Sequence, residues 1–471
     1  MESPSAPTDP SSNSELIPRR VPLHTKILIG LILGTILGLL ANVIGSGTGT
    51  DSNGNGLADW LDATVYWVEP IGKVFLRLMF MVALPLVFSA LSLAVVEIGD
   101  VRKLGRLGLL TLAFTGLLSV SAVIIGVFLV NGIQPGKSLP VELRDRIISK
   151  EQGTTEKRIQ QAKEAKPLRD TLVDMVPENP LQEMVGALDG SSKGNGMLAV
   201  MVFALIVGIA ISVRPEKCGG LVSVLEGINT VSMTVIEFAM RLAPLGAGCL
   251  VFTVTAQLGF PILQTLAWFV GTCLLGLALH LFGTYPAVLV TFARKNPMVF
   301  FREIREAALV AFGTSSSNAT LPTAIKVANN DLKLPSRVAN FVLTIGATGN
   351  QNGTALFEGV VVLFLAQVMG IDLSFGQQLT VVMMSVLAGV GTAGVPGGSI
   401  PLIIVVMQSV GIPAQAIGIV FGVDRLLDMC RTTVNVVGDL VVAQCVASTE
   451  SRFSSNSESG VAAGDVNSVA S

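Results

Sequence analysis

The sequence is poor in the residues that soluble enzymes and metalloproteins use most. Only 14% of its 471 residues are charged, whereas soluble domains carry about 25%. Two histidines, together with five scattered cysteines that form no CxxC pair, exclude a zinc site with the usual spacing. A net charge of −2 and the lack of a basic run with interleaved aromatic residues exclude a nucleic-acid partner.

Instead, the chain contains many long apolar segments. Apolar residues make up 51% of the chain and the mean hydropathy is +0.67, which predicts an all-α polytopic membrane protein in a lipid bilayer. A bilayer is crossed by about 20 mostly apolar residues. Candidate transmembrane helices of that length lie near 25–46, 70–97, 105–131, 196–214, 231–255, 262–293, 337–369 and 414–447.

Two further apolar segments are interrupted at their middles. Segment 300–328 contains TSSSNATLP, and segment 376–410 contains AGVGTAGVPGGS. Gly, Pro and small hydroxyl residues at membrane depth are tolerated only where the backbone lines a cavity. Both segments are therefore expected to be re-entrant helical hairpins, which enter the membrane and turn back.

The charges outside these segments predict the orientation of the protein and its ends. Lys and Arg precede the first span and follow the second, fourth and sixth spans. We therefore expect a plasma or inner membrane protein with both termini in the cytoplasm. Residues 1–22 and 449–471 are polar and Ser-rich, and are expected to be disordered tails of a transporter that occupies 23–448. The charged stretch 136–195 is then external, and is expected to be helical and solvated.

The last span carries charged and polar residues at helical spacing. They occur in VDRLLDMCRTTVNVVGD, at Asp424, Asp428, Arg431, Thr432, Asn435 and Asp439. Because they are three or four positions apart, they share one broad face of a helix. Ionisable residues inside a membrane segment indicate a functional site, and the alternative is an internal salt-bridge network that pins helices together.

This set of side chains suits an acidic α-amino acid, which has two carboxylates and one ammonium group. Arg431 offers a planar fork for a carboxylate. Asp428 offers a negative partner for the ammonium group, and Asn435 can serve the α-carboxylate.

A second polar stretch, GATGNQNGTALFEG at 346–359, interrupts an apolar span. Each unpaired polar group in hydrocarbon costs several kcal/mol, so the break has to be buried in protein or line a solvated cavity. Unwound backbone supplies the bare carbonyl oxygens that hard cations prefer, which predicts cation binding. Glu358 is strongly disfavoured in its charged form at this depth, so it is a candidate proton carrier. The alternative is a permanently protonated Glu358 that donates one hydrogen bond.

The loop after the first span contains DSNGNGLADWLD, residues 51–62. Its oxygen-bearing positions 1, 3, 5, 7, 9 and 12 match a calcium-binding loop, with Gly56 at position 6. The ligands in this interpretation are Asp51, Asn53, Asn55, Leu57 through its carbonyl, Asp59 and Asp62. The alternative is a polar Asn/Gly turn that binds no ion.

Four motifs together carry a family resemblance: TSSSNATLP, GATGNQNGTALFEG, GTAGVPG and VDRLLDMCRTTVNVVGD. With these motifs in order, residues 20–447 resemble the glutamate/aspartate:cation symporter family. The resemblance implies eight transmembrane helices, two re-entrant hairpins, a homotrimer and an elevator-type mechanism. It also implies a static scaffold from segments 25–46, 70–97, 196–214 and 231–255, and a moving transport domain from segments 105–131, 262–293 and 298–447.

The same resemblance implies roles for individual residues. Arg431 would bind the substrate's side-chain carboxylate with Asp424 orienting it, and Asp428 would bind the amino group, which predicts aspartate or glutamate as substrate. Further substrate contacts would come from Thr354, Thr432, Asn435, Ser315, Ser316, Ser317 and the Val395 carbonyl. The family usually has a second arginine near this site, but the corresponding positions here are Ser315 and Met429.

Sodium sites are implied in the same way. The first would use Gly346, Asn350, Asn435 and Asp439, and the second would use Thr348, Gly389, Val390 and Thr392. A third site normally has an Asp at the position of Asn352 and a Thr at the position of Leu118. Because a carboxylate and a hydroxyl are lost together, we expect the third site to be weak or absent; the alternative is that Asn352 still ligates sodium through its amide oxygen.

The function predicted from these residues is secondary active symport of L-aspartate or L-glutamate, driven by sodium and with a proton carried by Glu358. Two alternatives within transport are proton-driven uptake without sodium and an amino-acid-gated anion channel. A membrane-bound sensor is disfavoured because the chain shows no signalling domain. Enzyme activity is disfavoured because the chain shows no nucleophile–base pair and no nucleotide-binding loop.

Overall fold

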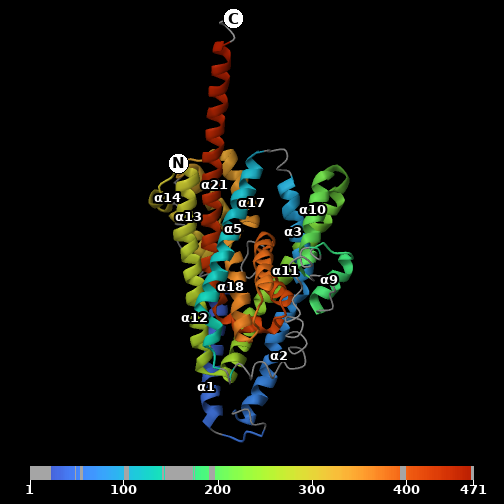
Figure 1. The fold of residues 1–471 in the computed structure, drawn as a ribbon. Coiled ribbons are helices and arrows are strands. Elements are labelled where there is room, and N and C mark those ends of the chain that lie inside the picture. The colour runs from blue at the N-terminus through green and yellow to red at the C-terminus, as the bar shows by residue number, and fades with distance from the viewer. Residues whose placement is uncertain are drawn as a thin grey trace, which may run out of the picture.

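The computed structural model describes residues 23–47, 49–52, 57–99, 106–140, 143, 173, 176–189, 197–392 and 399–467. Within these ranges the chain forms helices joined by short turns, and no strand. The helices form an elongated bundle, with α1 and α2 at one end and the end of α21 projecting beyond the other (Figure 1). In the described ranges, six helical segments are long and apolar enough to cross a membrane.

One group of helices packs around the long helix α11, Pro215–Leu258. It consists of α1 (Leu23–Gly47), α2 (Asp59–Met81) and α3 (Ala83–Gly99), with α10 (Met197–Val213) packed on α3 and the short α9 (Pro180–Asp189) packed on α10. The α1–α11 crossing is close because glycines face it. A Cβ atom at Gly30 or Gly34 would overlap the carbonyl oxygen of Pro244 or Gly248.

A second group packs around α18, Asn352–Val368. It includes α5 (Arg106–Ile133), α12 (Phe260–Leu279), α17 (Ser336–Gly349), α19 (Phe375–Gly391) and α21 (Phe421–Asn467). In the span formed by α17 and α18, 94% of the most apolar window is buried, against 22–50% in the other five spans. This span is therefore the core of the molecule rather than part of its lipid-facing surface.

Short elements complete the chain between these helices. After α5 comes η1 (Pro135–Ser138). The helix that begins with α12 continues through the π-helical turn η2 (His280–Thr284), α13 (Tyr285–Val288) and a second π-helical turn, η3 (Leu289–Ala293). The helix α14 (Pro297–Glu303) leads into the first hairpin, and η4 (Ala414–Ile419) precedes α21.

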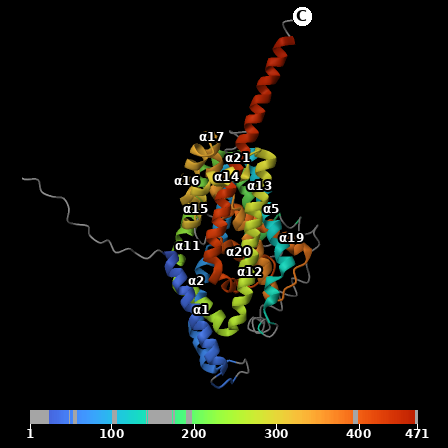
Figure 2. The ribbon, with the colours of Figure 1, turned by 90° about the vertical axis from the view of Figure 1, so that its left-hand side faces the viewer.

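The two interrupted segments fold as helical hairpins. In the first, α15 (Arg305–Thr314) packs against α16 (Ser317–Asn330) across a turn at Ser315, whose φ is +50°. Ser316 caps α16 by accepting a hydrogen bond from the Ala319 amide at 3.2 Å. In the second, α19 packs against α20 (Ile400–Ser409), and its tip at 393–398 lies outside the described residues. Figure 2 shows α15 and α16 in the half of the bundle from which α21 projects.

All eight segments expected to span the membrane fall on helices of the described residues, and six of these helical segments are long and apolar enough to cross it. The helix α10 has only 17 residues, and α21 begins with the charged face. Two other expectations differ from the structure. The span expected at 231–255 is only the second half of α11, because a helix can continue into polar sequence that hydropathy does not detect. The tail expected to be disordered from 449 is helical to Asn467, since an established helix elongates without a new nucleation step. The tail 1–22 lies outside the described residues, as does most of the stretch 136–195.

The α1–α11 crossing makes a first prediction. Replacing Gly34 with alanine puts a methyl group onto the Gly248 carbonyl, which the backbone cannot avoid without separating the helices. We expect Gly34→Ala to lower the free energy of unfolding by about 1–3 kcal/mol, measured by thermal unfolding in detergent. Gly227→Ala on α11 is the control, because a Cβ there meets nothing within 4 Å; equal stability of the two variants would refute the close crossing.

Candidate functional site

The break in the central span lies between Gly349 and Asn352. Asn350 and Gln351 leave helical geometry, with φ, ψ of −121°, 65° and −98°, 58°. Both are buried at 1% and 3% exposure, so their polar groups have to find partners within the protein. Asp439 and Asn435 of α21 are two of these partners, and Ala347 of α17 and Ser317 of α16 are the others.

The Asn435 side chain on α21 caps the N-terminal end of α18. Its Oδ1 accepts hydrogen bonds from the amides of Gly353 at 2.7 Å and Thr354 at 3.3 Å, which are free donors of a helix N-terminus. Its Nδ2 donates to Gln351 Oε1 and to Thr354 Oγ1. Gly353 is required here, since a Cβ would lie 2.6 Å from the Arg431 carbonyl oxygen.

A cluster of four charges lies on α21 over the three turns before Asn435. Arg431 Nη1 contacts Asp424 Oδ1 at 3.1 Å, and Arg431 Nε donates to Asp428 Oδ1 at 3.0 Å. The guanidinium also lies over the ring of Phe357 on α18, with Cζ 4.3 Å from the centroid. Arg431 is 1% exposed, so two carboxylates and an aromatic ring take the place of water around it.

Arg425 completes this cluster. Its Nη1 contacts Asp428 Oδ2 at 3.3 Å, so each oxygen of Asp428 has an arginine partner. Asp424, Arg425, Asp428 and Arg431 together carry no net charge. The positions where a second arginine is usual are Ser315 and Met429 in this chain, and Arg425 supplies a second guanidinium from a different position of the same helix.

A small polar cavity adjoins the cluster, between the turn of the first hairpin, the described ends of α19 and α20, the break and α21. Seven of the residues expected to bind substrate or lie near it line this cavity: Ser315, Ser317, Thr354, Asp428, Arg431, Thr432 and Asn435. Ser316 instead caps α16, and Val395 lies outside the described residues. Gln351 and Ser399 also line the cavity although the sequence gives no reason to assign them, because no periodicity connects residues across a break or a hairpin tip.

Three of the four residues expected at the first sodium site lie together. Asn350 Nδ2 donates to Asp439 Oδ1 at 2.8 Å, and Asn350 Oδ1 is buried without a partner among the described residues. Asp439 lies against Gly346, where a Cβ would overlap Oδ1. The ligand expected from Asn435 is its backbone carbonyl, while its side chain is hydrogen-bonded to the start of α18.

The second set expected to bind sodium surrounds the contact between α18 and α19. A Cβ at Gly389 would lie 3.0 Å from Ala355 Cβ and 3.4 Å from the Gln351 carbonyl oxygen. The hydroxyls of Thr348 and Thr392 donate to the carbonyls of Ile345 and Ala388. Val390 packs beside the core. These residues neighbour the described end of α19.

Both the oxygen and the nitrogen of the Asn352 side-chain amide form hydrogen bonds. Its Oδ1 accepts from Ser119 Oγ on α5 at 2.9 Å, and its Nδ2 donates to Tyr285 Oη at 3.3 Å. The Tyr285 hydroxyl donates in turn to the Val434 carbonyl at 2.9 Å. Gly438 makes room for this contact, because a Cβ there would lie 2.7 Å from Asn352 Nδ2.

Glu358 lies two turns further along α18 and is completely buried. Neither carboxyl oxygen has a hydrogen-bond partner among the described residues. The Thr392 hydroxyl lies nearby but donates to the Ala388 carbonyl at 2.8 Å. A carboxyl in such surroundings is stable only as the neutral acid unless a cation approaches it.

The loop expected to bind calcium uses its oxygens in another way. The Asp59 carboxylate accepts hydrogen bonds from the Ser52 amide at 2.9 Å, the Ser52 hydroxyl at 2.6 Å and the Thr50 hydroxyl at 3.0 Å. Leu57 packs its side chain against a small apolar cluster. Asn53 and Asn55 lie outside the described residues, and among those described no group of three His, Cys, Asp or Glu side chains could hold a metal. Calcium binding by this loop, with Asp51 and Asp62, remains an unsupported prediction.

The Asn352 network makes a second prediction. Tyr285→Phe removes one hydroxyl, which leaves the Asn352 amide and the Val434 carbonyl without this partner. We expect a loss of about 1 kcal/mol of unfolding free energy, measured by thermal unfolding in detergent. Tyr66→Phe, at a tyrosine that is 69% exposed beside Trp67, is the matched control. Identical unfolding of both variants would show that the network adds no stability.

Comparison with known proteins agrees with this geometry. The family model described as the sodium:dicarboxylate symporter family matches residues 23–449. The proton/sodium-glutamate symport protein of Bacillus subtilis is 29% identical over 431 residues, which cover 92% of this chain and 93% of that protein. The proton/glutamate-aspartate symporter of Escherichia coli is 31% identical over 400 residues, which cover 84% and 87%.

A relative from an animal has about the same sequence identity to this chain as these two bacterial proteins. An excitatory amino acid transporter of Caenorhabditis elegans is 32% identical over 419 residues, which cover 81% of each chain. The family match includes both hairpins, the broken span and the charged face of α21. Since the family consists of symporters, the chain is a membrane transporter and not an enzyme. It belongs to the sodium:dicarboxylate symporter family.

Proposed function

We propose that the protein is a symporter of acidic amino acids, L-aspartate or L-glutamate, driven by the sodium gradient. The observation that carries this proposal is the pair Arg431 and Asp428, side by side at a buried polar cavity. The names of the relatives, which are glutamate and glutamate-aspartate symporters, support the same substrate class.

The charge cluster explains why this substrate class is favoured. In the structure Arg431 and Asp428 neutralise each other. Removing one partner of a buried ion pair leaves an uncompensated charge. An acidic amino acid brings a side-chain carboxylate for Arg431 and an ammonium group for Asp428, so both charges are compensated while its α-carboxylate binds at Asn435. A neutral amino acid has only the α-carboxylate and would leave Arg431 without a new partner, and a dicarboxylate would leave Asp428 without one.

Substitution of Arg431 tests the substrate assignment. We expect Arg431→Gln to weaken L-aspartate uptake by about 100-fold, the equivalent of about 3 kcal/mol for one unpaired charge. Arg431→Lys should retain part of the uptake, because it keeps the charge but not the planar fork. Uptake of labelled L-aspartate into proteoliposomes is the measurement, and Arg214→Gln, at an exposed loop arginine, is the control. Full uptake by Arg431→Gln would refute the assignment.

Sodium coupling is supported by the first cation position. An oxygen of Asp439 lies against Gly346 and is hydrogen-bonded to Asn350, where α17 ends and the backbone leaves helical geometry. Oxygen ligands of this kind, with one carboxylate, suit a hard monovalent cation. The site is formed by the same break that lines the polar cavity, so cation and substrate would bind next to each other.

We propose further that the third sodium site is weak or absent. The Asn352 amide is neutral, and its oxygen already accepts from Ser119. Leu118, which is completely buried, presents no oxygen. A cation bound to this oxygen would compete with the hydrogen bond from Ser119 and would meet no carboxylate from residue 352 in return.

Glu358 is the proposed proton carrier. It is buried without a hydrogen-bond partner among the described residues, at a position on α18 that adjoins both Arg431 and the end of α19. A neutral Glu358 costs much less in this place than a charged one, which needs Arg431 or water nearby. Proton-driven uptake without sodium is the alternative that this residue would support.

Uptake under separate ion gradients tests the coupling. Proteoliposomes would receive a sodium gradient, an inward proton gradient, or both. We expect a sodium dependence with fewer than three ions, and acceleration by protons that disappears in Glu358→Gln. The control Glu306→Gln changes an exposed carboxylate paired with Lys326. The double variant Leu118→Thr/Asn352→Asp should steepen the sodium dependence.

Two outcomes would overturn parts of this proposal. Uptake driven by sodium alone with a three-ion dependence in the native protein would exclude the interpretation of Asn352 and Leu118. Uptake driven by protons without sodium would exclude sodium as the driving ion.

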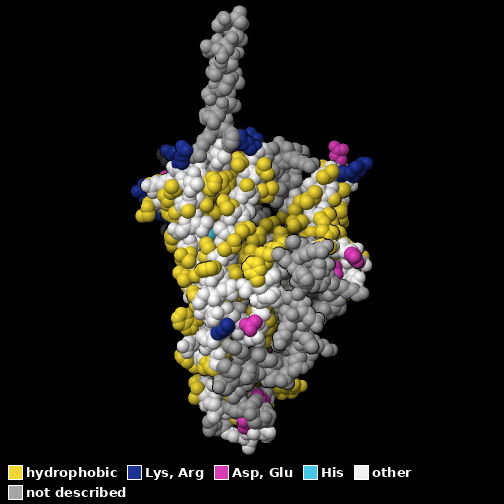
Figure 3. Space-filling model, in the orientation of Figure 1, with side chains coloured by type: hydrophobic (Ala, Val, Ile, Leu, Met, Phe, Trp, Pro, Cys, Tyr) yellow, Lys and Arg dark blue, Asp and Glu magenta, His cyan; other side chains and the backbone are white. Residues whose placement is uncertain are grey.

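The assembly and its motion are also proposals. Separate packing around α11 and around α18 supports a scaffold and a transport domain, as an elevator mechanism needs. Lys and Arg side chains gather near the end of the molecule from which α21 projects (Figure 3). This asymmetry supports a multi-pass cell-membrane protein with that end in the cytoplasm. A homotrimer is the proposed assembly.

A further inference from the structure

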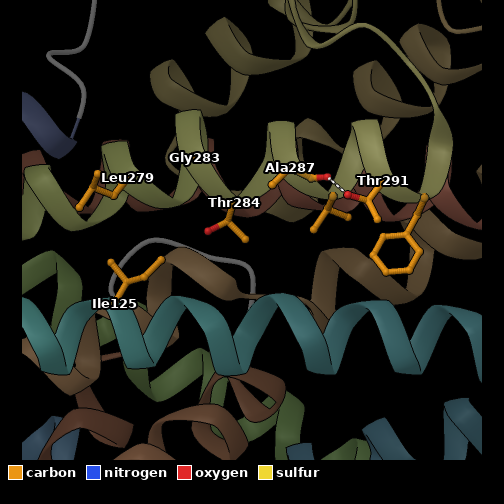
Figure 4. A pocket seen from close by; sticks show the side chains of 8 residues that line it. Ile125, Leu279, Gly283, Thr284, Ala287 and Thr291 are labelled. Atoms are coloured by element: carbon orange, nitrogen blue, oxygen red, sulfur yellow. Dashed lines mark hydrogen bonds between the residues drawn. The ribbon is translucent and has the colours of Figure 1, made fainter.

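A groove of about 520 Å³ lies on the outer face of the second helix group, away from the polar cavity. One wall is α5, and the other is the helix that runs from α12 to η3. Figure 4 shows Leu279 and Thr284 extending from this helix toward Ile125 on α5. No residue of the groove belongs to the proposed substrate or cation sites.

The groove exists because small residues line it on one side. Gly283, Thr284, Ala287 and Thr291 line it from the α12 side. A Cβ atom at Gly283 would meet nothing within 4 Å. The Thr291 hydroxyl donates to the Ala287 carbonyl at 2.7 Å, so this polar group is satisfied within the helix. The surface offered by Thr291 is therefore largely its methyl group.

The groove opens onto an apolar surface. Both walls belong to segments able to cross a membrane. Large apolar side chains surround it and point outward: Ile124 is 52% exposed, Phe128 79%, Phe282 65% and Val290 55%. In a bilayer such a surface faces hydrocarbon, so the occupant of the groove has to be apolar along its length.

Positive charge marks one end of the groove. The helix ends at Ala293, one residue after the lining residue Phe292, and Arg294 follows with a φ of +52°. Arg294 is exposed and forms no ion pair within the described residues, whereas its neighbour Lys295 is paired with Glu303 at 2.9 Å. Phe292 packs edge-on against Phe114 near the start of α5, with centroids 5.2 Å apart.

We propose that this groove binds one acyl chain of an anionic phospholipid, with the lipid phosphate at Arg294. From Leu279 to Phe292 the helix rises by about 20 Å, and one leaflet of hydrocarbon is about 15 Å thick. An acyl chain that begins at the end of the helix therefore fits within the groove. Arg294 lies where the apolar segment ends, which is the level of the headgroups.

The groove lies next to the hydrogen-bond network of Asn352. Tyr285 lies between the lining residues Thr284 and Ala287, and its hydroxyl holds Asn352 on the inner side. A lipid in the groove would pack on the outside of the same turn. The proposal does not depend on the transported substrate, so its failure would leave the proposed function intact.

Native mass spectrometry of the full-length protein tests the proposal, with phosphatidylglycerol and phosphatidylcholine as probes. A Cβ at Gly283 would meet nothing within 4 Å, so Gly283→Leu is a suitable substitution to fill the groove. We expect this variant to bind phosphatidylglycerol roughly tenfold more weakly, as for the loss of about two buried methylene groups. Ala287→Leu fills the next turn and should act in the same direction. Gly271→Leu is the control, because it lies on α12 in equally open space but does not line the groove.

Arg294→Gln tests the headgroup contact. We expect it to reduce the preference for phosphatidylglycerol over phosphatidylcholine by about fivefold, while Arg337→Gln, at an exposed arginine of α17, leaves it unchanged. Thermal unfolding would establish that each variant is folded. Unchanged lipid binding in folded Gly283→Leu and Ala287→Leu would mean that only general surface lipid is present, and would overturn the proposal. Loss of binding without any headgroup preference would overturn the assignment of Arg294.

Discussion

Arg431 can be buried only because two carboxylates of its own helix accompany it. An unpaired guanidinium in this place would be too costly, and a single misplaced partner would leave one charge uncompensated. The pairing needs α21 to be helical from Asp424 onward, so that residues three and seven positions apart meet Arg431. It also fixes α18, since Phe357 stacks on the guanidinium and Gly353 touches the Arg431 backbone. The break in the central span is held in place by these contacts and by Asn435.

Much of the fold could be predicted because apolar runs end where charges or turn residues begin. The segments expected at 25–46 and 105–131 correspond closely to Leu23–Gly47 and Arg106–Ile133. The polar interruption at Asn350 was predicted from the cost of polar groups in hydrocarbon, and the helix is broken there. Hydropathy could not detect where α11 and α21 continue beyond the apolar region, since a helix needs no apolar residue to elongate.

The candidate site was predictable along one helix and less so between helices. Spacing alone places Asp428, Arg431 and Asn435 on a common face. Arg425 was missed, although its separation of three residues from Asp428 is a signal that could have revealed the contact. Gln351 and Ser399 could not be found in this way, because their neighbours in space are distant in sequence and the tip between α19 and α20 has no regular period.

The hydrogen bonds around Asn352 also bear on how such a protein could change during evolution. A neutral amide needs one donor and one acceptor, and Ser119 and Tyr285 provide this complementary pair. A carboxylate would need donors on both sides, so Tyr285 would have to turn away from the Val434 carbonyl. Leu118 would still lack an oxygen. A single Asn352→Asp substitution would therefore place a carboxylate against the Tyr285 oxygen, which now accepts a hydrogen bond, so this network favours keeping the neutral amide until Tyr285 changes as well.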